Sequence, residues 1–428
     1  MSLHAQTPTA APLQTKIRLA LLATALCDAL GAPAEFNRRS SFSFIGHMEP
    51  NENFDLPAGV WTDDTSMALA LARSLATFQH HDGTEGRGGF DEADQLGAYY
   101  RWWKEGTLSA TGSCFDIGNT IQRAVSMYHN ALHAAGVEFS KGALAKVLEQ
   151  EAAKAALTRI GQDMSGAVFG GNGSLMRVLP IGLAYWRAAG DAGTVGELAA
   201  RSSAVTHPNA VCREACAVWA GAVARVVRSA VEGAEGTGNA RTMTKLDVLH
   251  HFAAHPYTTD ALRKALAAEV PLPEGMDAVA DSAAMEAHYA VHHPVLRLVT
   301  EMAQADSFYG ADDNDAVVAT RTLALLPPAS VLPSSGYVVH TIVAALYAFL
   351  ATPSFEMGAL LVANMGDDAD TVAAVYGGLA GAWYAEEDTP DAGTGFWTAR
   401  VRGWRNALVR RDLVEEVAEE LAAFAGEQ

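Results

Sequence analysis

Apolar residues recur along most of this chain at every third or fourth position, which is the spacing of one face of an α-helix. In the stretch KIRLALLATALCDAL, every fourth residue from Ile17 to Ala29 is apolar, and Gly31 and Pro33 then end the predicted helix. Similar helical stretches are predicted at 65–79, 91–104, 118–134, 141–158, 175–189, 208–230, 285–304, 336–351 and 371–386. Few segments show the alternation of a strand, so the sequence predicts an all-α protein, a bundle of helices.

The chain is expected to form one domain over residues 15–428. Breaks rich in turn-forming residues fall near 81–90, 231–241, 270–276 and 327–335. None of them separates parts of different composition, and the chemically suggestive residues come from both ends and the middle. Residues 1–14 are polar, contain prolines and lack the apolar stretch of a signal peptide, which predicts a flexible tail. Residues 231–283 are the best candidate for a peripheral insertion.

The bulk composition narrows the classes of partner. The chain has 428 residues, of which 50% are hydrophobic, and a formal net charge of −19. That charge argues against a nucleic-acid partner, because nucleic-acid binders present a basic surface, but bound cations could still hold a phosphorylated small ligand. Four cysteines are too few for a disulfide scaffold, so we expect a cytoplasmic protein. No apolar stretch is expected to reach the length needed to span a bilayer, and no membrane partner is predicted.

Histidine and cysteine spacing gives only a weak indication of zinc. Cys212 and Cys216 lie four residues apart near His207, but no second ligand pair follows and the segment reads as a helix with buried cysteines. The His-His pairs are expected to be solvated surface residues; they occupy 80–81, 250–251 and 292–293.

The first acidic element is the run Trp61-Thr62-Asp63-Asp64, which leads directly into a predicted helix. Thr62 or Asp63 is a natural N-cap, and carboxylates near a helix start are electrostatically favourable. Taken alone, the pair would most often have only this capping role.

The second acidic element places three carboxylates within the four residues 367–370, again at the start of a predicted helix. Ala373, Gly377 and Gly381 follow at intervals of four and form a smooth face for close helix packing. Because glycine is a poor helix former, its repeated use needs such a packing reason. A buried helix would hold its acidic start inside the protein, where carboxylates need cations.

Together the two elements supply oxygen ligands of the kind that Mg²⁺ accepts: Thr62, Asp63, Asp64, Asp368, Asp370 and Thr371. Their four carboxylates would balance two Mg²⁺ ions, for which Mn²⁺ could substitute. An oxygen-only ligand set argues against zinc and copper. Such a pair of ions can orient and polarise a substrate and lower the pKa of a bound water.

With three further stretches, these elements resemble the ADP-ribosylglycohydrolases. That family consists of all-α proteins with a binuclear Mg²⁺ centre, and one branch reverses the arginine ADP-ribosylation of dinitrogenase reductase. The five stretches are DALGAPAEF (28–36), WTDDTSMALA (61–70), CFDIGNT (114–120), GGNGSLMRVLPIGL (170–183) with TH at 206–207, and GDDADTVAAVYGGLAGA (366–382). The resemblance runs from about residue 17 to residue 386 and implies the compact orthogonal helical bundle of that family.

The resemblance also implies site residues. The metal ligands would be Thr62, Asp63 and Asp64 on one side and Asp368, Asp370 and Thr371 on the other. The expected catalytic residues are Glu35, Asp63, Asp116 and Asp368; of these, Glu35 matches a glutamate that helps activate water or contacts the ribose, and Asp116 a carboxylate that acts on the distal ribose. The residues expected to bind substrate are Asn119, Gly170, Gly171, Asn172, Gly173, Ser174 and His207.

Two neighbouring residues raise structural questions. The family usually has glycine where this chain has Cys27, so close packing there would need a small adjustment of the helix end. Asp28 stands in the last turn of its predicted helix, where the helix dipole disfavours an anion. We therefore expect a hydrogen-bonding partner for Asp28, which the sequence does not identify.

The predicted reaction is hydrolysis of the glycosidic bond at the anomeric carbon of ADP-ribose carried by a protein or a small molecule. In this hypothesis a metal-associated water, helped by Glu35, attacks that carbon. Arginine is the preferred acceptor, because WTDDTSMAL and CFDIGNT look closest to the bacterial arginine-type branch. Two alternatives stay open: a catalytically inactive ADP-ribose-binding member of the fold, and a metal-dependent nucleotide phosphodiesterase. No oligomeric state is predicted.

Overall fold

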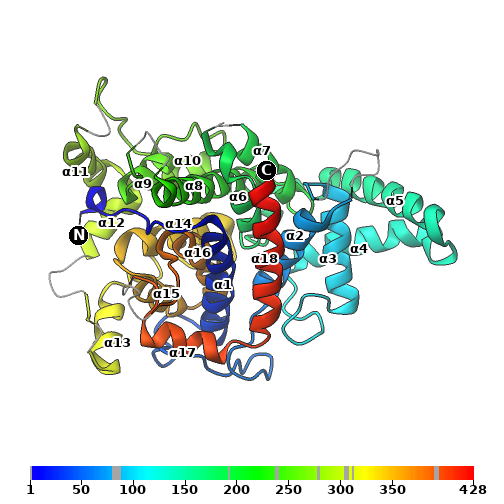
Figure 1. Ribbon diagram of the computed structural model, residues 1–428, viewed down its shortest axis with the longest axis horizontal. Helices are drawn as coiled ribbons and strands as arrows, with labels where there is room; N and C mark the ends of the chain where they lie inside the picture. The colour runs from blue at the N-terminus through cyan, green and yellow to red at the C-terminus, as the bar shows by residue number, and fades with distance from the viewer. Residues whose placement is uncertain are drawn as a thin grey trace.

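The computed structural model is built from helices joined by loops (Figure 1), and it describes residues 2–79, 88–190, 193–236, 241–276, 280–302, 308–310, 313–389 and 395–428. Within these residues the β-pairing consists of two isolated bridges, and the all-α prediction is confirmed. The α-helices are α1 (Leu13–Gly31), α2 (Asp63–Thr77), α3 (Glu92–Glu105), α4 (Asn119–Ala134), α5 (Gly142–Asp163), α6 (Leu179–Ala184), α7 (Thr194–Ala204), α8 (Ala210–Glu235), α9 (Lys245–Ala253), α10 (Asp260–Leu266), α11 (Ser282–His292), α12 (Pro294–Met302), α13 (Asp315–Ala324), α14 (Val338–Ala351), α15 (Phe355–Ala363), α16 (Ala369–Tyr384), α17 (Ala399–Ala407) and α18 (Arg411–Glu427).

Helices α1 and α16 pack tightly against each other in the middle of the molecule (Figure 1). A Cβ atom added at Gly377 would lie 2.5 Å from the carbonyl oxygen of Ala23, and one added at Gly381 would lie 2.7 Å from the Cβ of Ala23. Contacts that short are repulsive, so these positions need glycine. The small-residue packing face predicted for this helix is therefore confirmed at both glycines.

Helix α1 is a core helix, although its length and composition would allow it to cross a bilayer. The most apolar window of Leu13–Ala34 has a mean hydropathy of 1.4, and 89% of that window is buried in the protein. The expectation that no apolar stretch reaches bilayer-spanning length is therefore wrong. Its apolar surface is covered by α16 and α18, which pack against it.

Two of the predicted helices are interrupted. The stretch predicted at 285–304 forms α11 and α12, which are divided just before Pro294, a residue that has no N–H for the helical hydrogen bond. The stretch predicted at 175–189 begins as turns, and only the six residues of α6 form an α-helix there, with Pro180 in its first turn. In both cases a proline lies in the first turn of the helix, as expected for a residue whose missing N–H costs nothing at a helix start.

The N-terminal segment, predicted as a flexible tail, lies against the body of the protein. Leu3 is buried, and its backbone N–H donates to Glu286 Oε1 at 2.8 Å. The N–H of Thr9 donates to the carbonyl of Trp383 at 2.9 Å. The difference from the expected tail arises from α11 and α16, which supply these acceptors from distant parts of the sequence.

The segment predicted as a peripheral insertion, 231–283, shares the main hydrophobic core. Leu249 and Phe252 of α9 are fully buried within that core. The buried Lys245 donates to the carbonyls of Phe349 and Thr352, both at 2.6 Å, and thereby caps the end of α14. That the segment is an insertion stays a prediction.

The expectation of solvated His-His pairs is wrong for one member of each described pair. His251 is half-buried, and its Nε2 lies 2.8 Å from the carbonyl oxygen of Val218. His293 is fully buried, with Nε2 2.8 Å from the carbonyl oxygen of Leu266. Each ring thus satisfies a buried backbone carbonyl, which no local pattern encodes. The pair at 80–81 lies outside the described residues.

Candidate functional site

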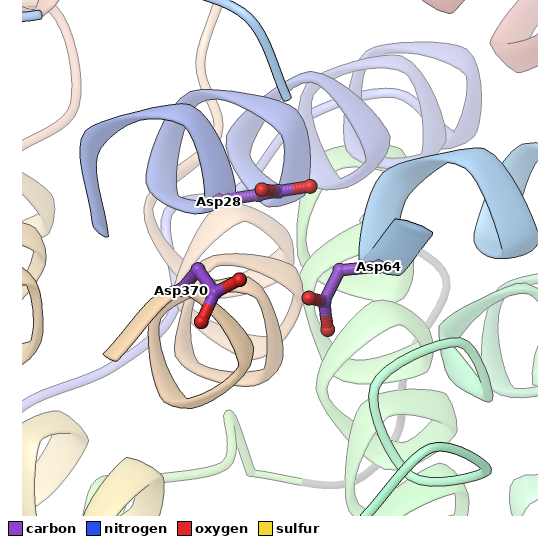
Figure 2. Close-up of side chains that lie close together, drawn as sticks. All are labelled: Asp28, Asp64 and Asp370. Atoms are coloured by element: carbon purple, nitrogen blue, oxygen red, sulfur yellow. The ribbon is translucent and has the colours of Figure 1, made fainter. Parts of the chain in front are cut away.

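The predicted acidic residues meet where α1 ends and where α2 and α16 begin. Figure 2 shows Asp28, Asp64 and Asp370 close together, each from one of these helix ends. One carboxylate oxygen of each lies within 4.8 Å of the others, and the same holds for Glu35, Asp116 and Asp370. The two acidic elements from opposite ends of the chain therefore form one cluster.

Asp28 finds its partners at the start of α2. The backbone N–H of Thr62 donates to both of its carboxylate oxygens, at 3.0 and 3.1 Å. Thr65 donates to Asp28 Oδ2 through its backbone N–H at 3.0 Å and through its hydroxyl at 2.5 Å. Burial raises the pKa of Asp28 to about 6, and these hydrogen bonds oppose that rise. The N-terminal dipole of α2 thus offsets the unfavourable C-terminal dipole of α1.

Two threonine hydroxyls join the carboxylates of α2 and α16. Thr62 is the N-cap of α2, since its Oγ1 accepts the N–H of Asp64. The same hydroxyl lies 3.1 Å from Asp64 Oδ2 and 3.5 Å from Asp370 Oδ2. Thr371 donates to Asp64 Oδ2 at 3.2 Å. Hydroxyl and carboxylate oxygens alike are hard ligands for a cation such as Mg²⁺.

The burial and the like charges of these carboxylates favour the binding of cations. Burial is the largest cause of a raised pKa at every carboxylate of the cluster: Asp28, Glu35, Asp63, Asp64, Asp116, Asp368 and Asp370. Within the described part of the chain, no lysine or arginine forms an ion pair with any of them. Buried oxygens without a hydrogen-bond partner there are Glu35 Oε2, Asp64 Oδ1, Asp116 Oδ2 and Asp370 Oδ1. Such a set fits divalent cations, which would supply the missing positive charge.

Asp63 and Asp368 lie beside these closely spaced groups rather than within them. Asp63 is the first residue of α2, and its pKa is raised by burial and then by the neighbouring Asp116. Asp368 precedes α16 and is half-buried. Asn172 donates to Asp368 Oδ2 and to Thr341 Oγ1, both at 2.8 Å. Asn172, expected to bind substrate, therefore also fixes the direction of one candidate ligand.

The glycine-rich loop is tied to the start of α14. The N–H of Asn172 donates to the carbonyl of Gly336 at 3.0 Å, and the N–H of Val338 donates to the carbonyl of Gly170 at 3.1 Å. Gly171 forms an isolated bridge with Tyr337. These bonds hold the loop against the cluster, where glycine would let backbone approach a phosphate closely.

Ser174 ends this loop, and His207 packs against it, since a Cβ added at Gly173 would lie 3.0 Å from His207 Cε1. His207 is 1% exposed, and its Nδ1 lies 2.7 Å from Thr206 Oγ1. Burial, followed by the nearby Arg177, lowers its pKa well below the usual range, so the ring is neutral. Ser174 is likewise buried and accepts a hydrogen bond from Ser203 at 2.8 Å. Contact of either side chain with substrate stays a prediction.

Asp116 and Asn119 belong to the loop that leads into α4. Asp116 is half-buried and adopts the left-handed conformation with φ 58°, and burial raises its pKa to about 7. Phe36 and Asp367 have φ values of 61° and 56°. Non-glycine residues rarely adopt this conformation, which tends to collect at functional sites. Asn119 is the exposed first residue of α4.

The cysteines near the site have packing roles. Cys27 is fully buried, and its Cβ would lie 3.0 Å from a Cβ added at Gly377, so the missing side chain of α16 leaves room for it. The thiols of Cys212 and Cys216 lie 3.3 Å from the carbonyl oxygen of Gly171 and 3.4 Å from Ser174 Oγ. Neither belongs to a group of ligands suited to a metal among the described residues.

Some residues of the site were not singled out from the sequence. Thr65 could have been noticed within WTDDTS, but its bond to Asp28 depends on how two helices pack. Thr341 supports Asn172 from a distant helix. Arg39 donates to the carbonyl of Met365 at 2.8 Å and to that of Leu332 at 2.8 Å, and so fixes the turn before α16. An arginine that binds backbone carbonyls has no sequence signature.

Comparison with known proteins agrees with this geometry. A family model described as ADP-ribosylglycohydrolase matches residues 9–428. The ADP-ribosylarginine hydrolase Tri1 of Pseudomonas putida (strain GB-1) is 28% identical over 371 residues, which is 87% of this chain and 71% of that protein. The ADP-ribosyl-[dinitrogen reductase] glycohydrolase of Rhodospirillum rubrum is 25% identical over 416 residues, 95% of each chain. A solved structure described as an ADP-ribosylglycohydrolase-related protein complex has a TM-score of 0.56 at 28% identity, over 96% of this chain and 99% of that one.

Proposed function

Because this chain belongs to the ADP-ribosylglycohydrolase family, we propose that it is a Mg²⁺-dependent hydrolase that removes ADP-ribose from modified arginine side chains. The observation that carries the proposal is the buried carboxylate cluster, in which Glu35, Asp64, Asp116 and Asp370 each keep an oxygen without a hydrogen-bond partner among the described residues. Arginine is the proposed acceptor because the relative from Pseudomonas putida is named for ADP-ribosylarginine.

The ligands that we assign to two Mg²⁺ ions are Thr62, Asp63, Asp64, Asp368, Asp370 and Thr371. The threonine hydroxyls already contact carboxylates of the set, at 3.1 Å and 3.2 Å from Asp64 Oδ2. Ions bound there would polarise the substrate and lower the pKa of a bound water. Asp28 and Asn172 hold the ligands in place through their own hydrogen bonds.

The reaction breaks the bond between the anomeric carbon and the acceptor nitrogen. In our proposal Glu35 accepts the proton of the attacking water, since its Oε2 is buried and has no hydrogen-bond partner among the described residues. A carboxylate oxygen of Glu35 also lies within 4.8 Å of one of Asp116. Asp116 binds hydroxyls of the distal ribose, and the loop from Gly170 to Ser174 holds the diphosphate. The proton reaches the leaving acceptor, so that free ADP-ribose and unmodified arginine are the products.

The first experiment is product analysis with proteins ADP-ribosylated separately on arginine and on serine, with Mg²⁺, with Mn²⁺ and with a chelator. Mg²⁺-dependent release of intact ADP-ribose from arginine is expected. Binding of ADP-ribose without release from either substrate would favour an inactive binding member. Appearance of a phosphomonoester would instead identify a phosphodiesterase.

A pair of variants tests the metal ligands. Asp368→Asn should abolish both Mg²⁺ binding, followed by calorimetry, and turnover. Asp367→Asn is the matched control, because Asp367 lies one residue earlier at φ 56°, a conformation that asparagine also tolerates. The control should keep Mg²⁺ affinity and activity close to wild type. Full turnover of Asp368→Asn with Mg²⁺ chelated would show that the ligand assignment is wrong.

A further inference from the structure

Phe36 is an exposed aromatic residue held in an unfavourable backbone conformation next to the cluster. Its side chain is 67% exposed, and its φ is 61°. The loop is fixed by a pair of backbone hydrogen bonds, since the N–H of Phe36 donates to the carbonyl of Asp367 and the N–H of Asp367 donates to the carbonyl of Asn37, both at 2.7 Å. A strained conformation that the surroundings enforce this firmly is typical of a functional position.

Three phenylalanine rings form a continuous row beside the carboxylates. The ring centroids of Phe36 and Phe54 are 6.3 Å apart and those of Phe54 and Phe115 are 5.6 Å apart, both edge to face. Phe36 directly follows Glu35, and Phe115 directly precedes Asp116. The row therefore connects the two loops that carry Glu35 and Asp116.

The loop that carries Phe54 is tied to the backbone of Glu35. Asn53 Nδ2 donates to the backbone carbonyl of Glu35 at 2.9 Å, which fixes Phe54 next to the Phe36 turn. Glu52 and Asp55, which are exposed, flank this pair. The neighbouring turn carries two basic residues, the exposed Arg38 and the half-buried Arg39, and the guanidinium of Arg39 is already engaged by the carbonyls of Met365 and Leu332. An apolar aromatic surface bordered by carboxylates has the charge and shape to receive a flat cation.

We propose that Phe36, Phe54 and Phe115 form the subsite for the acceptor, and that they receive the planar guanidinium of the modified arginine. This inference rests on the proposed function and deepens it. A guanidinium can stack on an aromatic face while its N–H groups, which lie in the plane, reach carboxylates at the edge. A serine acceptor has neither a flat face nor a charge, so the row would give it no comparable contact.

The test compares Phe36→Leu with Phe36→Trp on a protein ADP-ribosylated on arginine. The leucine variant keeps an apolar side chain but loses the ring, so its KM should rise about fivefold with kcat little changed. The tryptophan variant should restore the wild-type KM. The inhibition constant of free ADP-ribose should stay unchanged in both, because ADP-ribose has no acceptor. Phe139→Leu is the matched control, since Phe139 is 84% exposed and lies in the 3₁₀ helix Val137–Phe139, which follows α4.

The possible outcomes separate this inference from the function on which it rests. An unchanged KM of Phe36→Leu, while wild type cleaves the arginine-linked substrate, overturns the subsite alone. A KM and an ADP-ribose inhibition constant that rise together also overturn it, because the ring would then contact ADP-ribose. Cleavage of only the serine-linked substrate by wild type overturns both the arginine assignment and the subsite. Phe54→Leu, with the same expected rise in KM, replaces Phe36→Leu if that variant shows a lowered melting temperature.

Discussion

Replacing Asp28 with asparagine keeps the size of the side chain but removes its charge and one acceptor oxygen. The pKa of Asp28 is raised from 3.8 to about 6, so ionising this group at neutral pH costs the folded state about 3 kcal/mol relative to the unfolded chain. The substitution removes that cost. It also weakens the bonds from Thr62 and leaves the N–H of Thr65 facing an amide NH₂ group, which together cost about 3 kcal/mol.

The relief of the ionisation cost and the loss of hydrogen bonds nearly cancel in the free energy of unfolding, so Asp28→Asn should change the melting temperature by less than about 4 °C. The functional effect does not cancel, because the hydrogen bonds of Asp28 fix the turn that carries Thr62, Asp63 and Asp64. Loss of such a supporting group commonly lowers metal affinity or activity by about 10- to 100-fold. We expect a decrease of that size in Mg²⁺ affinity, measured by calorimetry, and in turnover of ADP-ribosylarginine.

Thr65→Ser is the matched control for this variant, because serine keeps the hydroxyl that donates to Asp28 Oδ2. It should retain Mg²⁺ affinity within a fewfold of wild type. If Asp28→Asn bound Mg²⁺ and turned over substrate like wild type, the positioning argument would be refuted. A fall of more than about 10 °C in melting temperature would show instead that the cancellation of the two energy terms was misjudged.

Three further predictions concern pH, packing and the N-terminal segment. Burial raises the pKa of Asp28 to about 6 and that of Asp116 to about 7, so their protonated forms stabilise the folded state below the unfolded pKa of about 4, and this contribution is lost as pH rises through 7. Protein kept free of Mg²⁺ by a chelator should therefore become less stable to urea as pH rises over that range. The increase in melting temperature that Mg²⁺ causes should become larger over the same range. Gly377→Ala should lower the free energy of unfolding by about 1–3 kcal/mol, because its Cβ would meet backbone at 2.5 Å, whereas Gly403→Ala, with nothing within 4 Å, should raise it by about 0.5–1 kcal/mol. Glu286→Ala should speed hydrogen exchange of the Leu3 amide, its donor, about tenfold or more without changing turnover; exchange as slow as in wild type would contradict the anchoring role.

The sequence allowed the metal-ligand candidates to be predicted because each set is local. Thr62, Asp63 and Asp64 are consecutive at one helix start, and the second set spans four residues at another, so cap preferences and charge density both mark them. The helix division before Pro294 is equally local, because proline lacks the N–H that would continue the helical hydrogen bonds. The partners of Asp28 were not readable, because Thr62 and Thr65 lie on a different helix and are brought to it only by packing.

Side chains that bind backbone carbonyls were harder still to predict. His251 and His293 each contact a single backbone carbonyl oxygen, and the buried Lys245 donates to two backbone carbonyls. Their acceptors are groups that every residue possesses, so sequence carries no trace of the pairing. The aromatic row escaped prediction for a related reason, since Phe36, Phe54 and Phe115 come from three loops whose approach is set by the fold.

The packing of α1 on α16 explains how a buried acidic cluster can form at all. The glycine face of α16 lets the backbones approach closely, and Gly31 at the end of α1 continues this contact, since a Cβ there would lie 2.8 Å from the Cα of Asp370. The end of α1 and the starts of α2 and α16 are thereby held together, and their carboxylates cannot move apart to reduce repulsion. Rigid core packing therefore keeps these negative charges close together, whereas flexible loops would let them move apart. A change that loosens this contact, such as Gly31→Ala, should lower Mg²⁺ affinity although it alters no ligand.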